Sequence, residues 1–189
     1  MRKLTYYIAT SFDGFVSRTD DSIDDFSFEG EHVPDLLSEY PETIPTHLRS
    51  YFDLANQNRH FDTVLMGRRT YEMGLAAGVT SPYQHLDQYV FSTSMDSSPD
   101  AAVTLVKTNA IDVVRSLKAS DGLDIWLCGG PSLAFALLDE IDAIIVKVNP
   151  FLMGAGKPLF SSAFPKRDLQ LVDRRDYRNG FALVHYKLR

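Results

Sequence analysis

The sequence predicts an α/β fold in which a mostly parallel central sheet ends in an antiparallel hairpin. Short apolar runs alternate with segments of helical periodicity through most of the chain, and this alternation is typical of parallel strands joined by helices. Near the C-terminus, two alternating segments at 169–175 and 181–188 flank the pair Asn179-Gly180, which strongly favours a hairpin turn. The hairpin would add an antiparallel edge to the sheet.

The composition is that of one globular domain. At 189 residues the chain can form one substantial core, so we expect residues 1–189 to be a single domain. Its net charge of -6 argues against general nucleic-acid binding. No apolar run approaches the roughly 20 residues of a membrane helix, and the first residues alternate like a strand rather than a signal peptide. We therefore expect a cytoplasmic protein with no nucleic-acid or membrane partner.

The single cysteine, Cys128, excludes an internal disulfide and a cysteine-rich metal site. It lies in an apolar run, where a small core residue is more common than a reactive thiol. We therefore predict no metal site and a structural role for this side chain.

The first expected strand, Lys3 to Thr10, carries bulky residues on both faces, which predicts a central place in the sheet. The polar segment Ser17 to Glu31 follows; a loop this long is usually a lid, a binding loop or mobile, and its acidic residues are otherwise a solvated surface. Thr46 can cap a helix that extends through Ala55. Further strands are expected at 63–66, 89–91, 103–105, 125–128 and 143–148, and further helices near 35–40, 67–73, 111–117 and 131–138.

Residues 124–138 read as a buried strand that passes through two glycines directly into a helix. Gly129 and Gly130 leave no side chain in the way of a ligand, and Pro131 suits the first turn of a helix. The free N–H groups at that helix start would favour an anion such as a phosphate. The alternative is a tight strand-to-helix turn with no ligand.

A second junction of this kind follows the strand at 63–66. Gly67 there is followed by Arg68 and Arg69, and a guanidinium group suits a phosphate better than an ammonium group does. The alternative for the two arginines is a solvated helix surface. The strand at 89–91 runs out into hydroxyl side chains, so three strand ends carry groups that suit a phosphorylated ligand.

The order of these motifs resembles the dihydrofolate reductase superfamily, and more closely its branch that contains the C-terminal reductase domain of riboflavin biosynthesis. Val64 to Glu72 is similar to that superfamily's strand and Gly-Arg-x-Thr helix start, and Phe91 to Ser94 to its next strand end. Trp126 to Gly130 resembles its glycine pair, which is typically joined by a cis peptide. Ser11 to Gly14 and Pro150 to Phe160 are similar to the riboflavin-type branch in particular.

The resemblance implies a three-layer α/β/α dihydrofolate-reductase-like fold, NADPH as cofactor and a small aminopyrimidine or pterin-like substrate. The nicotinamide would lie near Ala9 and the glycine pair. Arg68 or Arg69, with hydroxyl groups from the strand end at Ser92, would hold the 2′-phosphate, which predicts NADPH over NADH. The expected cofactor-binding residues are Ala9, Gly67, Arg68, Arg69, Thr70, Ser92, Thr93, Gly129, Gly130, Pro131 and Ser132.

The branch commonly dimerises, so we expect a homodimer. The terminal hairpin and the apolar residues Phe151, Leu152 and Phe160 could supply the shared face, although these residues also suit a core.

The sequence departs from the superfamily where the chemistry should be. True dihydrofolate reductases carry a tryptophan and an acidic residue early in the chain, whereas the single tryptophan here is Trp126. The riboflavin-like branch often has an Asp-Trp pair in its first loop, and the corresponding place reads Asp24-Asp25-Phe26. The leading hypothesis is an NADPH-dependent reductase resembling 5-amino-6-(5-phosphoribosylamino)uracil reductase. The alternatives are pterin reduction of the dihydrofolate reductase type, and a non-catalytic nucleotide-binding or regulatory module.

Asp13 is the carboxylate that we expect to contact the reacting substrate. It directly follows the central first strand, and Gly14 lets the chain turn sharply beside it. Such a carboxylate could bind the donor groups of an aminopyrimidine or relay a proton. The alternative is that Asp13 accepts backbone N–H bonds within its own Asp-Gly turn.

Overall fold

The computed structural model describes residues 1–54 and 57–189, and a single sheet of eight strands runs through it. The prediction of an α/β fold with a mostly parallel sheet is confirmed. The strands follow one another across the sheet as β5 (Val103–Val106), β4 (Asp87–Phe91), β3 (Phe61–Gly67), β6 (Asp124–Gly129), β1 (Leu4–Ser11), β7 (Ala143–Asn149), β10 (Ala182–Leu188) and β9 (Leu169–Asp176).

The six strands from β5 to β7 pair in parallel, and β10 and β9 pair antiparallel at one edge. The turn between β9 and β10 contains Gly180, whose positive φ of 85° suits a residue without a β-carbon. The C-terminal hairpin is therefore confirmed. β1 lies between β6 and β7, so its predicted central place is also confirmed.

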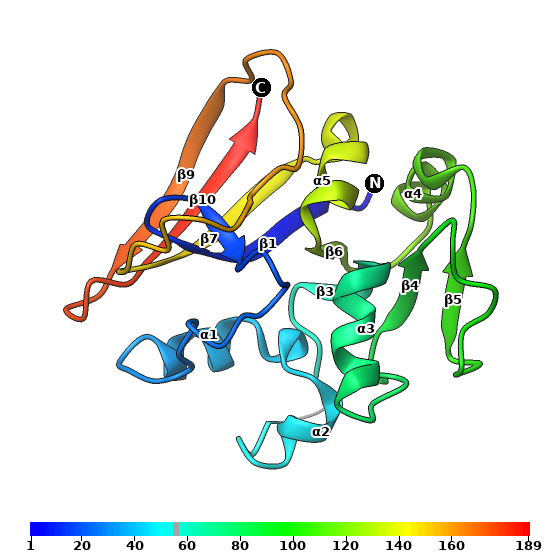
Figure 1. Ribbon diagram of the computed structural model, residues 1–189, viewed down its shortest axis with the longest axis horizontal. Coiled ribbons are helices and arrows are strands. Elements are labelled where there is room, and N and C mark those ends of the chain that lie inside the picture. The colour runs from blue at the N-terminus through cyan, green and yellow to red at the C-terminus, as the bar shows by residue number, and fades with distance from the viewer. Residues whose placement is uncertain (55–56) are drawn as a thin grey trace.

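Helices cover both faces of the sheet and complete three layers (Figure 1). Leu36 and Tyr71, from the helices on one face, pack in a cluster with Trp126. On the other face, Val114 and Leu133 pack against the strands in a second cluster. The helices on the first face are α1 (Val33–Glu39), η1 (Pro41–Thr43), α2 (Thr46–Arg49) and α3 (Arg68–Ala76). Those on the other face are α4 (Ala110–Ala119), α5 (Pro131–Ala136) and η2 (Leu138–Glu140). Among the described residues, no helix has the length and apolar character needed to cross a membrane.

The helix expected from Thr46 through Ala55 is wrong in its extent. α2 ends at Arg49, and Ala55 lies outside the described residues. Thr46 does not cap the helix; its hydroxyl accepts the Gln84 N–H at 2.8 Å and lies 3.1 Å from His85 Nδ1. The side chain ties this segment to the loop before β4, and a tertiary contact has replaced the local cap.

β2 (Phe15–Ser17) pairs antiparallel with β8 (Lys157–Pro158) in a small second sheet that the sequence pattern did not predict. Gly156 permits this pairing, because a β-carbon there would collide with the carbonyl oxygen of Ser17. The pairing draws the loop after β7 onto the segment after β1 and places both beside the carboxyl ends of the parallel strands.

A buried carboxylate fixes the start of β3. Glu42 is fully buried and accepts the backbone N–H groups of His60 at 2.7 Å, Phe61 at 2.9 Å and Arg59 at 3.3 Å. A buried N–H group without an acceptor is costly, so Glu42 substitutes for strand partners that this part of the chain lacks.

We expect Glu42→Ala to lower the free energy of unfolding by about 3 kcal/mol, because it leaves one buried and two partly buried N–H groups without an acceptor and opens a cavity. Urea denaturation measures the change. Glu29→Ala, which removes an exposed carboxylate from the loop after β2, is the matched control and should leave the midpoint unchanged. Equal stability of the two variants would contradict this role for Glu42.

Candidate functional site

The two strand–glycine–helix junctions lie side by side in the structure. Gly67 ends β3 and Gly129 ends the neighbouring strand β6. A β-carbon on Gly67 would lie 3.4 Å from the Gly130 nitrogen, and one on Gly130 would lie 3.6 Å from Thr70 Oγ1. The Gly129-Gly130 peptide is cis, as the resemblance implied. Two backbones and the first turn of α3 therefore approach closely at one point of the sheet edge.

This point is where the chain direction across the sheet reverses. β3 leads through α3 to β4 on one side, whereas β6 leads through α5 to β7 on the other. The two helices pack on opposite faces of the sheet. In open α/β sheets, ligands bind at such a reversal, outside the carboxyl ends of the strands.

A cleft of about 1120 Å³ opens at this edge of the sheet. Ala9, predicted as a neighbour of the nicotinamide, is not among the residues that line it. The other predicted cofactor-binding residues all line the cleft: Gly67, Arg68, Arg69, Thr70, Ser92, Thr93, Gly129, Gly130, Pro131 and Ser132. Segments far apart in the sequence thus meet where the sequence analysis placed a phosphate site.

Both arginines of the cleft already have carboxylate neighbours. Arg68 Nη1 lies 2.7 and 2.9 Å from the two carboxylate oxygens of Glu72, one turn along α3. Arg69 is more exposed, at 63%, and its guanidinium lies 3.9 Å from Asp21. Ion pairs at an exposed surface are weak, so a phosphate could replace the carboxylates as the partner of these two guanidinium groups.

The hydroxyl groups after β4 differ in their availability. Ser92 is buried, and its hydroxyl accepts the N–H groups of Ser94 at 3.2 Å and Met95 at 3.0 Å. The Ser92 hydroxyl therefore stabilises the turn that follows β4. Thr93 is exposed and lines the cleft, so its hydroxyl is the more accessible of the two.

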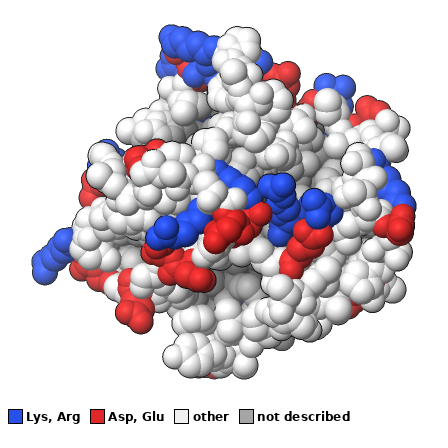
Figure 2. Space-filling model, in the orientation of Figure 1, with Lys and Arg blue, Asp and Glu red and all other residues white. Residues whose placement is uncertain are grey.

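The structure adds two lysines that the sequence analysis missed. Lys107 directly follows β5, and Lys157 begins β8; both line the cleft. The position of Lys107 after a parallel strand was a signal that could have found it. Among the described lining residues the Lys and Arg side chains are Arg68, Arg69, Lys107 and Lys157, against the single carboxylate of Asp21, although the whole chain has a net charge of -6. Figure 2 shows basic and acidic side chains gathered in a band across this face of the molecule.

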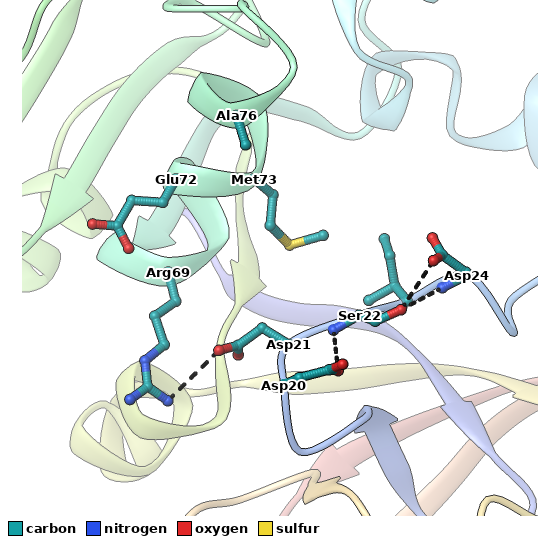
Figure 3. Close-up of a pocket in the computed structure, with 9 residues that line it drawn as sticks. Asp20, Asp21, Ser22, Asp24, Arg69, Glu72, Met73 and Ala76 are labelled. Atoms are coloured by element: carbon teal, nitrogen blue, oxygen red, sulfur yellow. Dashed lines mark hydrogen bonds and ion pairs between the residues drawn. The ribbon is translucent and has the colours of Figure 1, made fainter.

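The acidic segment after β2 forms part of the cleft. Its turn is held by Arg18, which makes two hydrogen bonds of 2.6 and 2.7 Å to Asp25. The segment lies against α3, where Met73 points toward it and Arg69 toward Asp21 (Figure 3). Of the roles expected for this segment, the structure favours a loop that borders the ligand site.

Asp13 lies outside the cleft lining. Its carboxylate accepts hydrogen bonds from the Ser11 hydroxyl at 2.6 Å, the Met153 N–H at 3.0 Å and the Gly154 N–H at 2.8 Å. The Met153 N–H, followed by Ser11 and Gly154, lowers the pKa of Asp13 to about 2. The side chain ties the turn after β1 to the loop after β7, and its catalytic role stays a prediction.

A lysine without a carboxylate partner lies next to Ala9. Lys147 of β7 pairs in register with Ala9 of β1, and its ammonium lies 4.2 Å from the centre of the Tyr7 ring. Within the described part of the chain, its ammonium makes no ion pair or hydrogen bond. Burial lowers the pKa of Lys147 to about 8, and Cys128 acts weakly in the opposite direction.

The titratable groups around Lys147 are neutral at neutral pH. Burial raises the pKa of Tyr7 well above its usual value and that of Tyr40 to about 12. Burial raises the pKa of the Cys128 thiol to about 11, which fits the structural role expected for this cysteine. Burial also lowers the pKa of His32. Lys147 is therefore an isolated cation among neutral groups.

Comparison with known proteins gives relatives over the whole chain. The Bacillus subtilis (strain 168) protein YwjB, which is uncharacterised, is 33% identical over 190 residues that span 98% of this chain and 97% of YwjB. A second uncharacterised protein of that strain, YyaP, is 25% identical and is matched over 94% of its length. These relatives share the chain's length but add no activity to it.

Solved structures share the fold. A Shewanella sp. PV-4 protein, described as a riboflavin biosynthesis protein, matches the entire chain and 99% of its own with a TM-score of 0.73 and 23% identity. The Thermotoga maritima diaminohydroxyphosphoribosylaminopyrimidine deaminase/5-amino-6-(5-phosphoribosylamino)uracil reductase matches the entire chain and 57% of its own, with a TM-score of 0.67 and 14% identity.

The RibD C-terminal domain family matches residues 2–183, which is nearly the whole chain. Together with the dihydrofolate-reductase-like fold of the structural neighbours, this match confirms the resemblance drawn from the motifs. The chain belongs to the RibD C-terminal domain family, which is reductase-related.

Proposed function

We propose that the chain is an NADPH-dependent reductase of a small heterocyclic substrate. The observation that carries the proposal is the meeting of the glycine-containing ends of β3 and β6 beside a cleft whose lining is locally cationic. Membership of a reductase-related family supports the general class of reaction. The chemistry of the cleft supports the choice of cofactor, and the resemblance to the riboflavin-type branch supports the choice of substrate.

The lining fits the phosphate groups of NADPH. The α3 helix begins at Arg68 with no side-chain cap, so the N–H groups of its first turn and the Thr70 hydroxyl are available to a phosphate. A β-carbon on Gly130 would meet only Thr70, which shows that the fold has room there for a ligand atom instead. Arg68 and Lys107 would bind the 2′-phosphate.

NADPH would supply the hydride when bound, and this chain would supply orientation and a proton. Reduction of a C=N or C=O bond needs a proton at the heteroatom. Asp13, with its pKa near 2, is ionised at neutral pH and suits the role of acceptor rather than acid. Lys147, with its pKa near 8, is protonated at neutral pH. Like Asp13 it does not line the cleft, but it pairs in register with Ala9, where the nicotinamide is expected, and we assign it the proton.

The substrate would be an aminopyrimidine of the kind named for the Thermotoga maritima relative, 5-amino-6-(5-phosphoribosylamino)uracil. The sequence segments around Ser11 to Gly14 and Pro150 to Phe160 support this class over dihydrofolate. A non-catalytic nucleotide-binding module is favoured instead by one observation, the occupation of the Asp13 carboxylate by three donors.

We expect NADPH to bind at least about tenfold more tightly than NADH, because charge-assisted hydrogen bonds to the 2′-phosphate contribute on the order of 1.5 to 3 kcal/mol. Calorimetric titration with both nucleotides measures the ratio. Arg68→Gln should reduce it. Arg115→Gln, which removes an α4 arginine that pairs with Glu140 of η2, should not. Equal affinities for the two nucleotides would contradict the assignment, and NADPH binding without turnover of pyrimidine or pterin substrates would favour the non-catalytic module.

We expect Lys147→Met to stabilise the protein at pH 7 by about 1 to 3 kcal/mol. The folded-state pKa of Lys147 lies below the ordinary value of 10.5, so the cation destabilises the fold below about pH 8 and this penalty fades as the pH rises toward 10.5. The gain should therefore shrink between pH 7 and pH 10 in denaturation curves. The same variant should lose most of its turnover. A variant less stable than the wild type at pH 7 would contradict the isolated cation.

We also propose that the chain forms a homodimer. Phe151 packs on Phe26 and Phe160 on Tyr6, so these residues are used within the chain. The edge strand β9 is exposed along almost its whole length and presents unpaired apolar side chains, which favours pairing with a second copy. The apolar residues are Leu169, Leu171 and Val172, exposed at 44%, 54% and 46%.

Leu171→Glu should convert the dimer into a monomer, because it places a charge in the centre of the shared face. Light scattering at micromolar concentration measures the mass. Ile111→Glu, at an exposed position on α4, is the control and should leave the dimer intact. A wild-type mass of one chain would contradict the homodimer.

A further inference from the structure

Two cations from separate elements converge on one carboxylate at the mouth of the cleft. Arg69 comes from the first turn of α3, and Lys157 comes from β8. The Lys157 ammonium contacts Oδ1 of Asp21, and the Arg69 guanidinium lies 3.9 Å from Oδ2, so each carboxylate oxygen faces one cation. All three residues line the cleft.

The turn that carries Asp21 is well defined. The Arg18 N–H donates to the Ser22 carbonyl at 2.9 Å, and the Asp21 N–H donates to the Arg18 carbonyl at 3.2 Å. Asp21 itself has a φ of 73°, in the left-handed region that Asp and Asn enter more easily than most residues. The turn therefore presents this one carboxylate to the cleft, whereas Asp24 bonds only to Ser22 (Figure 3).

A carboxylate is unexpected between these two cations of the cleft. It is the only acidic side chain among the described residues that line the cleft, and it sits where two cations could hold a phosphate oxygen each. The loop after Lys157 returns to the start of α5, where the Ser161 N–H donates to the Pro131 carbonyl at 3.4 Å. The two cations and the starts of α3 and α5 line the same cleft.

We propose that Arg69 and Lys157 form a phosphate-binding subsite, and that the Asp21 carboxylate occupies it in the ligand-free chain. The inference deepens the proposed function, because the phosphate belongs either to the cofactor's pyrophosphate or to a phosphorylated substrate. Asp21 is then a competitor of the ligand, and the acidic segment moves aside when the phosphate binds. Its contact with Arg69 is weak enough to exchange, since Asp21 is 38% and Arg69 63% exposed.

Asp21→Asn tests the competition, because asparagine keeps the shape and the left-handed backbone but removes the charge. Calorimetric titration of the full-length protein would use NADPH, ADP-ribose and ribose 5-phosphate. ADP-ribose has the pyrophosphate without the 2′-phosphate, and ribose 5-phosphate stands for the substrate's phosphate. We expect Asp21→Asn to bind at least one probe about three- to tenfold more tightly than the wild type. Lys157→Gln should bind the same probe more weakly.

Asp24→Asn is the matched control, since it removes one negative charge from the same segment at a residue without a cation partner, and its affinities should stay within about twofold of the wild type. Tighter binding of ADP-ribose assigns the subsite to the cofactor, and tighter binding of ribose 5-phosphate alone assigns it to the substrate. If Asp21→Asn binds ribose 5-phosphate more tightly while neither protein binds NADPH, the subsite stands and the proposed cofactor fails. No change for any probe, or an equal change in Asp24→Asn, overturns the inference.

Discussion

The site depends on the close approach of two neighbouring strand ends. The helices that follow β3 and β6 pack on opposite faces of the sheet, so the backbone must turn sharply at both strand ends, which are neighbours. Gly129 meets this demand with a φ of 135°, a conformation that side chains disfavour, whereas Gly67 and Gly130 have ordinary φ values and little or no steric need to be glycine. The missing β-carbon of Gly130 leaves space open toward the cleft, since one built there would meet only Thr70 Oγ1. The constraint on the fold and the opening for a ligand thus come from adjacent residues, with different physical causes.

The parts of the fold that could be predicted from the sequence are those with a local signal. The buried strands and the hairpin turn at Gly180 each have a periodicity or a turn pair of their own. α2, with four residues, is too short to show a helical period, and its Thr46 has a tertiary partner. The pairing of β2 with β8 joins strands of three and two residues that lie about 140 positions apart. Such short strands show no periodicity in the sequence that could predict it.

The same distinction separates the site residues that were predicted from those that were missed. Gly67 and its arginines sit in a recognisable motif, and so do the residues around Gly129. Lys157 and Asp21 enter the cleft only because the small second sheet brings their segments together. Their roles depend on which strands are neighbours in space, which the order of motifs along the chain does not determine.

The two candidates for proton transfer illustrate how surroundings decide the role of a charged group. Three donors stabilise the Asp13 carboxylate as an anion and lower its pKa, so it is a poor proton donor. The same hydrogen bonds join the turn after β1 to the loop after β7. Lys147 has the opposite environment: a ring face and neutral hydroxyl, thiol and imidazole groups, none of which can compensate its charge. The pKa of an ammonium in such surroundings is lowered, so it transfers its proton more readily to a neighbouring acceptor. The first loop of this chain reads Asp24-Asp25-Phe26 where the resemblance implies an Asp-Trp pair, so the tryptophan is the missing residue, and a lysine on β7 beside Ala9 is physically suited to supply a proton.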